Sequence, residues 1–191
     1  MARIVLPLIS VLTIYLYSQS SVAGDASVPS VVFADLGIRY TPPAGMVDKS
    51  TPAAEQARER ANSYNARAAE LLLDLSSGAT DDKPEWHQIW IFHFPRAQLS
   101  GMSDWMAEAK MNNSLAGPNA TGIGQPRNAT FDGHSFLVSE FEREESPLTK
   151  HAKIFTTVCK TQLVSFVFVS NSVEQISGME DSLKSLSFSG K

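Results

Sequence analysis

Apolar residues occupy both faces of a two-residue period between Trp86 and Phe94, and Pro95 ends the segment. Side chains of a strand point alternately to its two faces. One face therefore carries two tryptophans and two phenylalanines, and the other carries two isoleucines flanked by His87 and His93. A strand that is apolar on both faces is typical of the interior of a covered sheet. We predict a central strand with apolar cover above and below.

Other strand-like patterns surround this segment. The run 71–75 alternates with a period of two, although a leucine-rich helix end would give a similar pattern. Only Lys160 and Thr161 separate the last two apolar runs, which predicts a hairpin even though neither residue favours the positive φ of a tight hairpin turn. The predicted strands are 31–33, 37–40, 71–75, 135–142, 152–159 and 162–170.

Three segments have helical spacing. Thr51-Pro52 is typical of a helix start, and one helix face then follows at steps of four, three and four, with Ala57, Ala61, Tyr64 and Ala68. A second helix is predicted over 99–109, with its apolar face formed by Leu99, Met102, Trp105, Met106 and Ala109. The segment 112–126, rich in Asn and Gly, is predicted to be irregular.

The third helix follows Ser172, which forms a capping-box pattern with Gln175. Its apolar positions recur at steps of three, four and three, and the run 186–188 is predicted to add a short strand or extended tail. The apolar positions are Ile176, Met179, Leu183 and Leu186.

These elements predict an α+β fold with a mainly antiparallel sheet flanked by helices. No repeat or Pro/Gly/Ser tract divides the chain, so 31–191 is predicted to be a single domain after a short linker at 24–30. The chain of 191 residues is long enough to bury its own core. Cys159 is the only cysteine, so no intramolecular disulfide can form.

The first 23 residues predict a cleavable signal peptide. Arg3 precedes an apolar run of about 14 residues, and Ser21-Val22-Ala23 places small residues before the expected cleavage point. A membrane-spanning helix is the competing interpretation, but spanning takes about 20 apolar residues. We therefore expect an exported protein, periplasmic or extracellular, with no stable membrane insertion after cleavage.

The formal net charge is -4, from 16 basic and 20 acidic residues. Binding to nucleic acid needs clustered Lys and Arg that displace phosphate counterions. The composition therefore argues against nucleic acid as a partner, and against anionic membrane surfaces for the same reason.

The order of parts resembles the Mog1p/PsbP-like superfamily over roughly 31–188. The resemblance lies in the strand Leu36–Tyr40, the Pro-Pro-Ala-Gly turn at 42–45, and the S-L-x-S-L-x-F ending within Met179–Phe188. It implies an α/β/α sandwich around an antiparallel sheet. Members include photosystem accessory proteins, a Ran-binding factor and exported bacterial proteins of unknown role, so the resemblance implies no single activity and no site residues.

Acidic and histidine side chains are the first candidates for chemistry. His87 and His93 share a strand face but lie roughly 20 Å apart along it, too far to bind one metal together. Glu140, Glu142 and Glu144 would share a strand face with Glu145 beside them. Such a row suits a hard cation, but it is more typical of a solvated sheet edge.

Nucleophiles and sequons give weaker signals. Cys159 beside Lys160 could be an activated thiolate if His151 reached it, but a buried apolar role is the commoner one. No G-x-S-x-G, H-E-x-x-H or glycine-rich phosphate loop surrounds the serines Ser139, Ser165 and Ser170. The sequons at Asn112, Asn119 and Asn128 are treated as chance matches in an Asn-rich region.

These observations favour an exported, non-enzymatic binding or accessory protein whose partner is an unknown protein or small ligand. We predict no catalytic, cofactor-binding or metal-binding residue. One alternative is a hydrolase or metal-dependent enzyme whose site is assembled from distant residues such as His134, Glu140 and His151. Another is a structural accessory subunit of an envelope or membrane complex.

Overall fold

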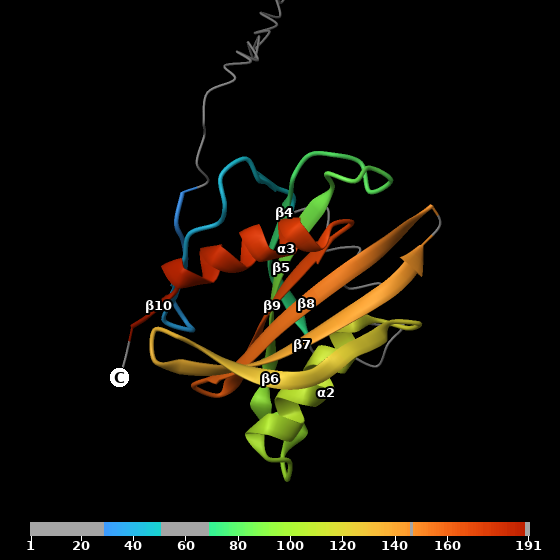
Figure 1. The fold of residues 1–191 in the computed structure, drawn as a ribbon. Helices are drawn as coiled ribbons and strands as arrows, with labels where there is room; N and C mark the ends of the chain where they lie inside the picture. The colour runs from blue at the N-terminus through green and yellow to red at the C-terminus, as the bar shows by residue number, and fades with distance from the viewer. Residues whose placement is uncertain (1–28, 51–68, 146, 190–191) are drawn as a thin grey trace, which may run out of the picture.

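The computed structural model describes residues 29–50, 69–145 and 147–189 (Figure 1). The predicted signal peptide, most of the predicted linker and the predicted helix that begins at Thr51-Pro52 lie outside the described residues. Within the described ranges, no helix has both the length and the apolar character needed to cross a membrane.

A seven-stranded antiparallel sheet is the centre of the fold, in the order β3-β4-β5-β9-β8-β7-β6. The predicted α+β class with a mainly antiparallel sheet is confirmed. The strands are β3 Val47–Asp48, β4 Glu70–Ser76, β5 His87–Pro95, β6 Thr121–Phe131, β7 His134–Glu145, β8 Leu148–Cys159 and β9 Gln162–Ser170.

One face of this sheet carries the main core. A small sheet of β1 (Val31–Phe33), β2 (Ile38–Tyr40) and β10 (Ser187–Phe188) lies over it, so the two ends of the described chain pair with each other. Helix α3 (Val173–Glu180) and the 3-10 helix η2 (Asp181–Ser185) complete this cover (Figure 1). The apolar spacing predicted for the third helix is confirmed, because its four apolar positions are all buried.

Strand β5 lies inside the sheet, between β4 and β9, as predicted. Its two faces differ, however. Ile89 and Ile91 are fully buried on the α3 side, whereas Trp90 and Phe92 on the opposite side are only half-buried. The expectation of complete apolar cover on both faces is therefore correct for one face only.

Helix α2 (Asp104–Ala116) covers part of the second face. It begins later than predicted because Gly101 has a φ of +85° and the Ser103 hydroxyl accepts a hydrogen bond from the Met106 backbone N–H. The predicted apolar face was wrong at two of its five positions, whereas Leu99 is buried and Met102 is partly buried. Trp105 and Met106 are 55% and 52% exposed, and the helix is instead buried at Ala107, Met111 and Asn112.

Of the predicted irregular segment 112–126, only 117–120 is irregular, and the rest belongs to the end of α2 and the start of β6. Glycine and proline are tolerated in β6 because it is an edge strand, with Pro126 inside a register shift between Ile123 and Arg127. The predicted β8–β9 hairpin is confirmed, and Lys160 takes a positive φ of +54° to make the turn. The predicted capping box is wrong, because the Ser172 side chain makes no hydrogen bond that caps α3.

Candidate functional site

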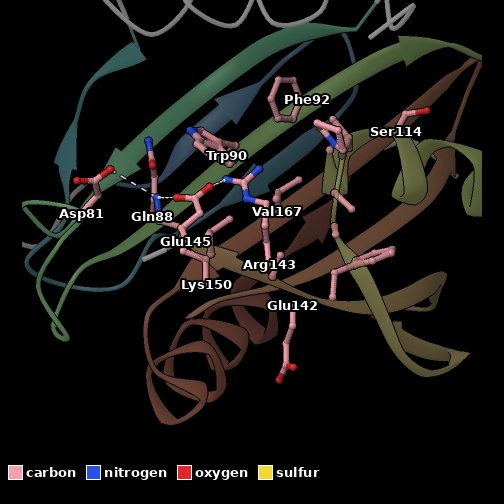
Figure 2. A pocket seen from close by; sticks show the side chains of 18 of the residues that line it. Asp81, Gln88, Trp90, Phe92, Ser114, Glu142, Arg143, Glu145, Lys150 and Val167 are labelled. Carbon is pink, nitrogen blue, oxygen red and sulfur yellow. Dashed lines mark hydrogen bonds and ion pairs between the residues drawn. The ribbon is translucent and has the colours of Figure 1, made fainter. Parts of the chain in front are cut away.

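A hollow of about 490 Å³ lies on the α2 side of the large sheet (Figure 2). Helix α2 packs mainly over β7 and β8, so aromatic side chains of β5 line a space that the helix leaves beside it. Strand pairing places Trp90 opposite Val167, and the two form a cluster with the buried Trp86. We call this space the aromatic hollow. Its apolar lining includes Trp86, Trp90, Phe92, Phe141 and Val167.

The rim of the aromatic hollow carries an ordered row of charges. Lys150 Nζ lies 4.9 Å from the centre of the Trp86 ring, 2.6 Å from Glu145 Oε2 and 3.5 Å from Asp81 Oδ2. Arg143 pairs with Glu145 on its other side (Figure 2). The Lys150 ammonium, followed by Arg143, lowers the pKa of Glu145. The charged side chains of the rim are thus paired with one another.

Asp74 adds a buried carboxylate to the lining of the aromatic hollow. It is 2% exposed, and Gln88 Nε2 donates a hydrogen bond of 2.6 Å to its Oδ1. Burial raises the pKa of Asp74, and hydrogen bonds from the Gln88 and Trp90 side chains oppose that rise. Sequence reasoning missed this residue, although an aspartate within an apolar strand was a signal for it.

The glutamate row on β7 lies on the opposite face of the sheet. β7 is followed by β6 and so is not the sheet edge, which corrects the expectation of a solvated edge. Lys153 Nζ lies 3.4 Å from Glu140 Oε1, and His151 Nδ1 lies 3.2 Å from Glu142 Oε1. Glu140 and Glu142 of the row therefore each lie next to a basic side chain of β8. In the described ranges, no group of three or more His, Cys, Asp or Glu side chains is placed to hold a metal ion.

The three residues of the enzymatic alternative are not brought together. The His134 ring stacks on Phe188 with centroids 3.8 Å apart. Glu140 lies six residues further along the same strand, roughly 20 Å away, and pairs with Lys153. His151 pairs with Glu142 instead.

The remaining histidines and the cysteine have local partners. His93 Nε2 lies 3.0 Å from Glu70 Oε2, and His87 Nδ1 lies 3.0 Å from a backbone carbonyl. Cys159 is buried, and its thiol donates to the Leu36 carbonyl at 3.2 Å. Burial raises the pKa of this thiol, which opposes thiolate formation. The predicted buried role of Cys159 is confirmed.

Asn112 has a structural role that was not predicted from the sequence, where it was considered only as part of a sequon. It is fully buried, and its Nδ2 donates to the Leu137 carbonyl at 3.2 Å and to Ser139 Oγ at 2.9 Å. Thr156 Oγ1 lies 2.5 Å from Asn112 Oδ1 and 2.6 Å from Ser165 Oγ. This polar network ties α2 to three neighbouring strands. It also gives two of the serines considered above a structural function.

Glu108 on α2 gives a pH-dependent prediction. Burial raises its pKa to about 7 from the ordinary 4.5, and the nearby Asp104 carboxylate adds to the rise. Below pH 4.5 both the folded and unfolded chains are protonated here. Between pH 4.5 and about 7 the unfolded chain has already lost this proton, whereas the folded chain still holds it. The free energy of unfolding therefore falls with rising pH across this interval.

We therefore expect Glu108→Gln to stabilise the protein at pH 8 relative to pH 4. Allowing for solvent screening of a partly exposed group, the gain is about 1 kcal/mol in the free energy of unfolding. Urea unfolding at the two pH values measures it. Glu174→Gln is the matched control, because the Ser172 hydroxyl lowers the pKa of Glu174 and the opposite dependence is expected. Equal gains at both pH values would contradict the assignment.

Comparison with known proteins gives a match in structure but not in sequence. No protein-family model and no curated protein sequence matches the chain. The solution structure of cyanobacterial PsbP (CyanoP) from Synechocystis is similar over 90% of this chain and 98% of its own, with a TM-score of 0.56 and 11% sequence identity. The chain has a Mog1p/PsbP-like fold.

A crystal structure from Bacteroides thetaiotaomicron matches 81% of this chain at 10% identity and a TM-score of 0.47. The chain spans 46% of that protein.

The PsbP-like fold explains the sequence motifs that suggested it. The early strand 36–40 contains β2, and the S-L-x-S-L-x-F ending buries Leu183 of η2 and Leu186, which directly follows η2, in the core. Its last residue, Phe188, lies in β10 and pairs with Ile38 of β2. The motifs thus join the two ends of the described chain over one sheet face, and the aromatic hollow lies on the other face.

Proposed function

We propose that this protein is an exported, non-enzymatic accessory protein that binds a small ligand through the aromatic hollow. The carrying observation is the hollow itself, with Trp86, Trp90 and Phe92 in its lining and a fixed row of charges at its rim. Pockets of several hundred Å³ with apolar walls and a few placed polar groups are the usual form of small-molecule sites.

Export is supported by the N-terminal sequence pattern. A mature N-terminus at Gly24 in secreted material would test it.

The three tryptophans allow a direct test of ligand binding. Trp86 and Trp90 line the aromatic hollow, whereas Trp105 is exposed on α2 and lies outside its lining. We expect indole, added at millimolar concentration, to shift the side-chain N–H signals of Trp86 and Trp90 in ¹H–¹⁵N NMR. The Trp105 signal is the internal control and should stay in place. Shifts of all three together, or of none, would contradict a specific site.

A substitution that fills the hollow gives the second arm of this test. Ala152 of β8 lines the aromatic hollow, so Ala152→Phe places a ring where the ligand would lie. We expect it to weaken indole binding by about tenfold or more. Ala97→Phe is the matched control, because Ala97 is exposed on the 3-10 helix η1 (Arg96–Leu99) and lies outside the lining.

The accessory-subunit alternative is favoured by a different observation. Trp105 and Met106 expose large apolar side chains next to each other on α2. Exposed apolar patches often mark contacts with other proteins. Recovery of the same partners by the unchanged protein and by a Trp105→Ala, Met106→Ala double variant would count against docking through this surface.

A further inference from the structure

The aromatic hollow already contains one ammonium group of the protein itself. Lys150 Nζ lies over the Trp86 ring and between the carboxylates of Glu145 and Asp81. The negative face of an indole ring and a carboxylate both attract a cation, and this electrostatic attraction becomes stronger when water is partly excluded. The side chain of Lys150 is only 13% exposed. The rim is therefore chemically suited to hold an ammonium group.

Asp74 and Trp90 repeat this pairing of carboxylate and indole. They are partners across β4 and β5, so both side chains lie on the same face of the sheet, and both line the hollow. Within the described residues Asp74 has no salt-bridge partner at 4 Å or less, and Lys49 acts on it only through its longer-range field. A buried carboxylate without a paired cation is costly for a protein to maintain.

The charge balance of the lining points in the same direction. Among the described lining residues whose side chains face the hollow, Asp74, Asp81 and Glu145 carry three negative charges and Arg143 and Lys150 carry two positive charges, a net charge of -1. Glu142 points away from the hollow and pairs with His151 on the other face (Figure 2). A carboxylate or phosphate ligand would meet a lining that is negative overall, and a cation would neutralise it.

We propose that the ligand of the aromatic hollow is an organic ammonium compound with an apolar or aromatic body. This inference rests on the proposed binding function of the hollow. The ammonium group lies beside the Asp74 carboxylate and the Trp90 indole, and the body of the ligand packs along Phe92 and Val167. Gln88 keeps the carboxylate in position through its 2.6 Å hydrogen bond.

A series of three probes of nearly equal shape tests this charge preference in the unchanged protein. The probes are phenethylammonium, neutral 2-phenylethanol and anionic 3-phenylpropionate, followed by the Trp86 and Trp90 N–H signals. Cation–π attraction and a charge-assisted hydrogen bond predict about tenfold or more tighter binding of phenethylammonium than of 2-phenylethanol. Equal binding of these two, or tighter binding of 3-phenylpropionate, overturns the inference but leaves the hollow a binding site. If no probe shifts either signal, both proposals fail.

Two variants connect the preference to the named residues. Asp74→Asn keeps the size of the side chain and an acceptor for Gln88, so it should remove the preference for phenethylammonium while 2-phenylethanol still binds. Lys150→Met acts in the opposite direction, because it removes the ammonium that Glu145 and Asp81 now hold. We expect it to increase phenethylammonium affinity by about threefold or more as the lining becomes more negative. A preference that survives Asp74→Asn, or an affinity that falls in Lys150→Met, overturns the inference.

Discussion

Phe166→Ala should lower the free energy of unfolding by about 4 kcal/mol, the usual cost of removing a fully buried aromatic ring. Phe166 lies on β9 in the middle of the large sheet and is completely buried. Its ring packs edge-on against Tyr40 of the small sheet at 5.4 Å and lies 6.2 Å from Phe136. Its removal leaves a cavity between the two sheets, at the position where they are held together.

Urea unfolding measures this loss directly, and two controls locate it. Phe166→Leu keeps most of the volume and should cost no more than about 1.5 kcal/mol. Because Phe166 faces away from the aromatic hollow, the N–H signals of Trp86 and Trp90 should be unchanged in Phe166→Ala well below its unfolding midpoint. A cost below about 1 kcal/mol would mean that the two sheets do not share this core.

Alternation of apolar residues was sufficient to predict most of the large sheet. Strand β9 buries Val164, Phe166 and Phe168 on the α3 side, and β5, β7 and β8 each add two buried apolar residues there, so a register error would expose these side chains to water. The closing helix was equally readable, because Ile176 and Met179 are buried at helical spacing. These elements are recognisable because burial and local periodicity agree in them.

Helix α2 could not be placed correctly from periodicity. The positions of Trp105 and Met106 fit a helical stripe that includes Leu99, but the helix starts only after the Ser103 cap. The actual contact with the sheet is made through the small side chain of Ala107 and through Met111. A hydrophobicity pattern does not distinguish a bulky exposed residue from a buried one when the start of the helix is misplaced by one turn.

The aromatic hollow could not be predicted from the sequence either. It exists because α2 covers only part of one sheet face, which depends on the tertiary path of the chain and not on any motif. Its charged rim combines residues distant in sequence, since Asp81 and Lys150 are brought together only by folding. The sequence showed an apolar strand at Trp86–Phe94, and only the structure shows that one face of it lines an open space.

Asn112→Ala should destabilise the protein by about 3 kcal/mol, because it leaves several buried polar groups without partners. The Leu137 carbonyl and Ser139 Oγ each lose a donor, and Thr156 loses its acceptor. Such groups are costly because water cannot reach them to replace the lost hydrogen bonds. The network lies between α2 and the sheet, so the loss should weaken the packing of the helix.

Asn113→Ala is a close control for this prediction, since it makes the same chemical change one position along the same helix. Asn113 is exposed, so its substitution should change the free energy of unfolding by less than about 0.5 kcal/mol. Hydrogen exchange should show faster opening of α2 in Asn112→Ala, with the core strand β9 affected less. Equal unfolding free energies for the two variants would show that the buried network does not hold the helix. Because α2 forms one wall of the aromatic hollow through Ser114, a loosened helix should also weaken indole binding.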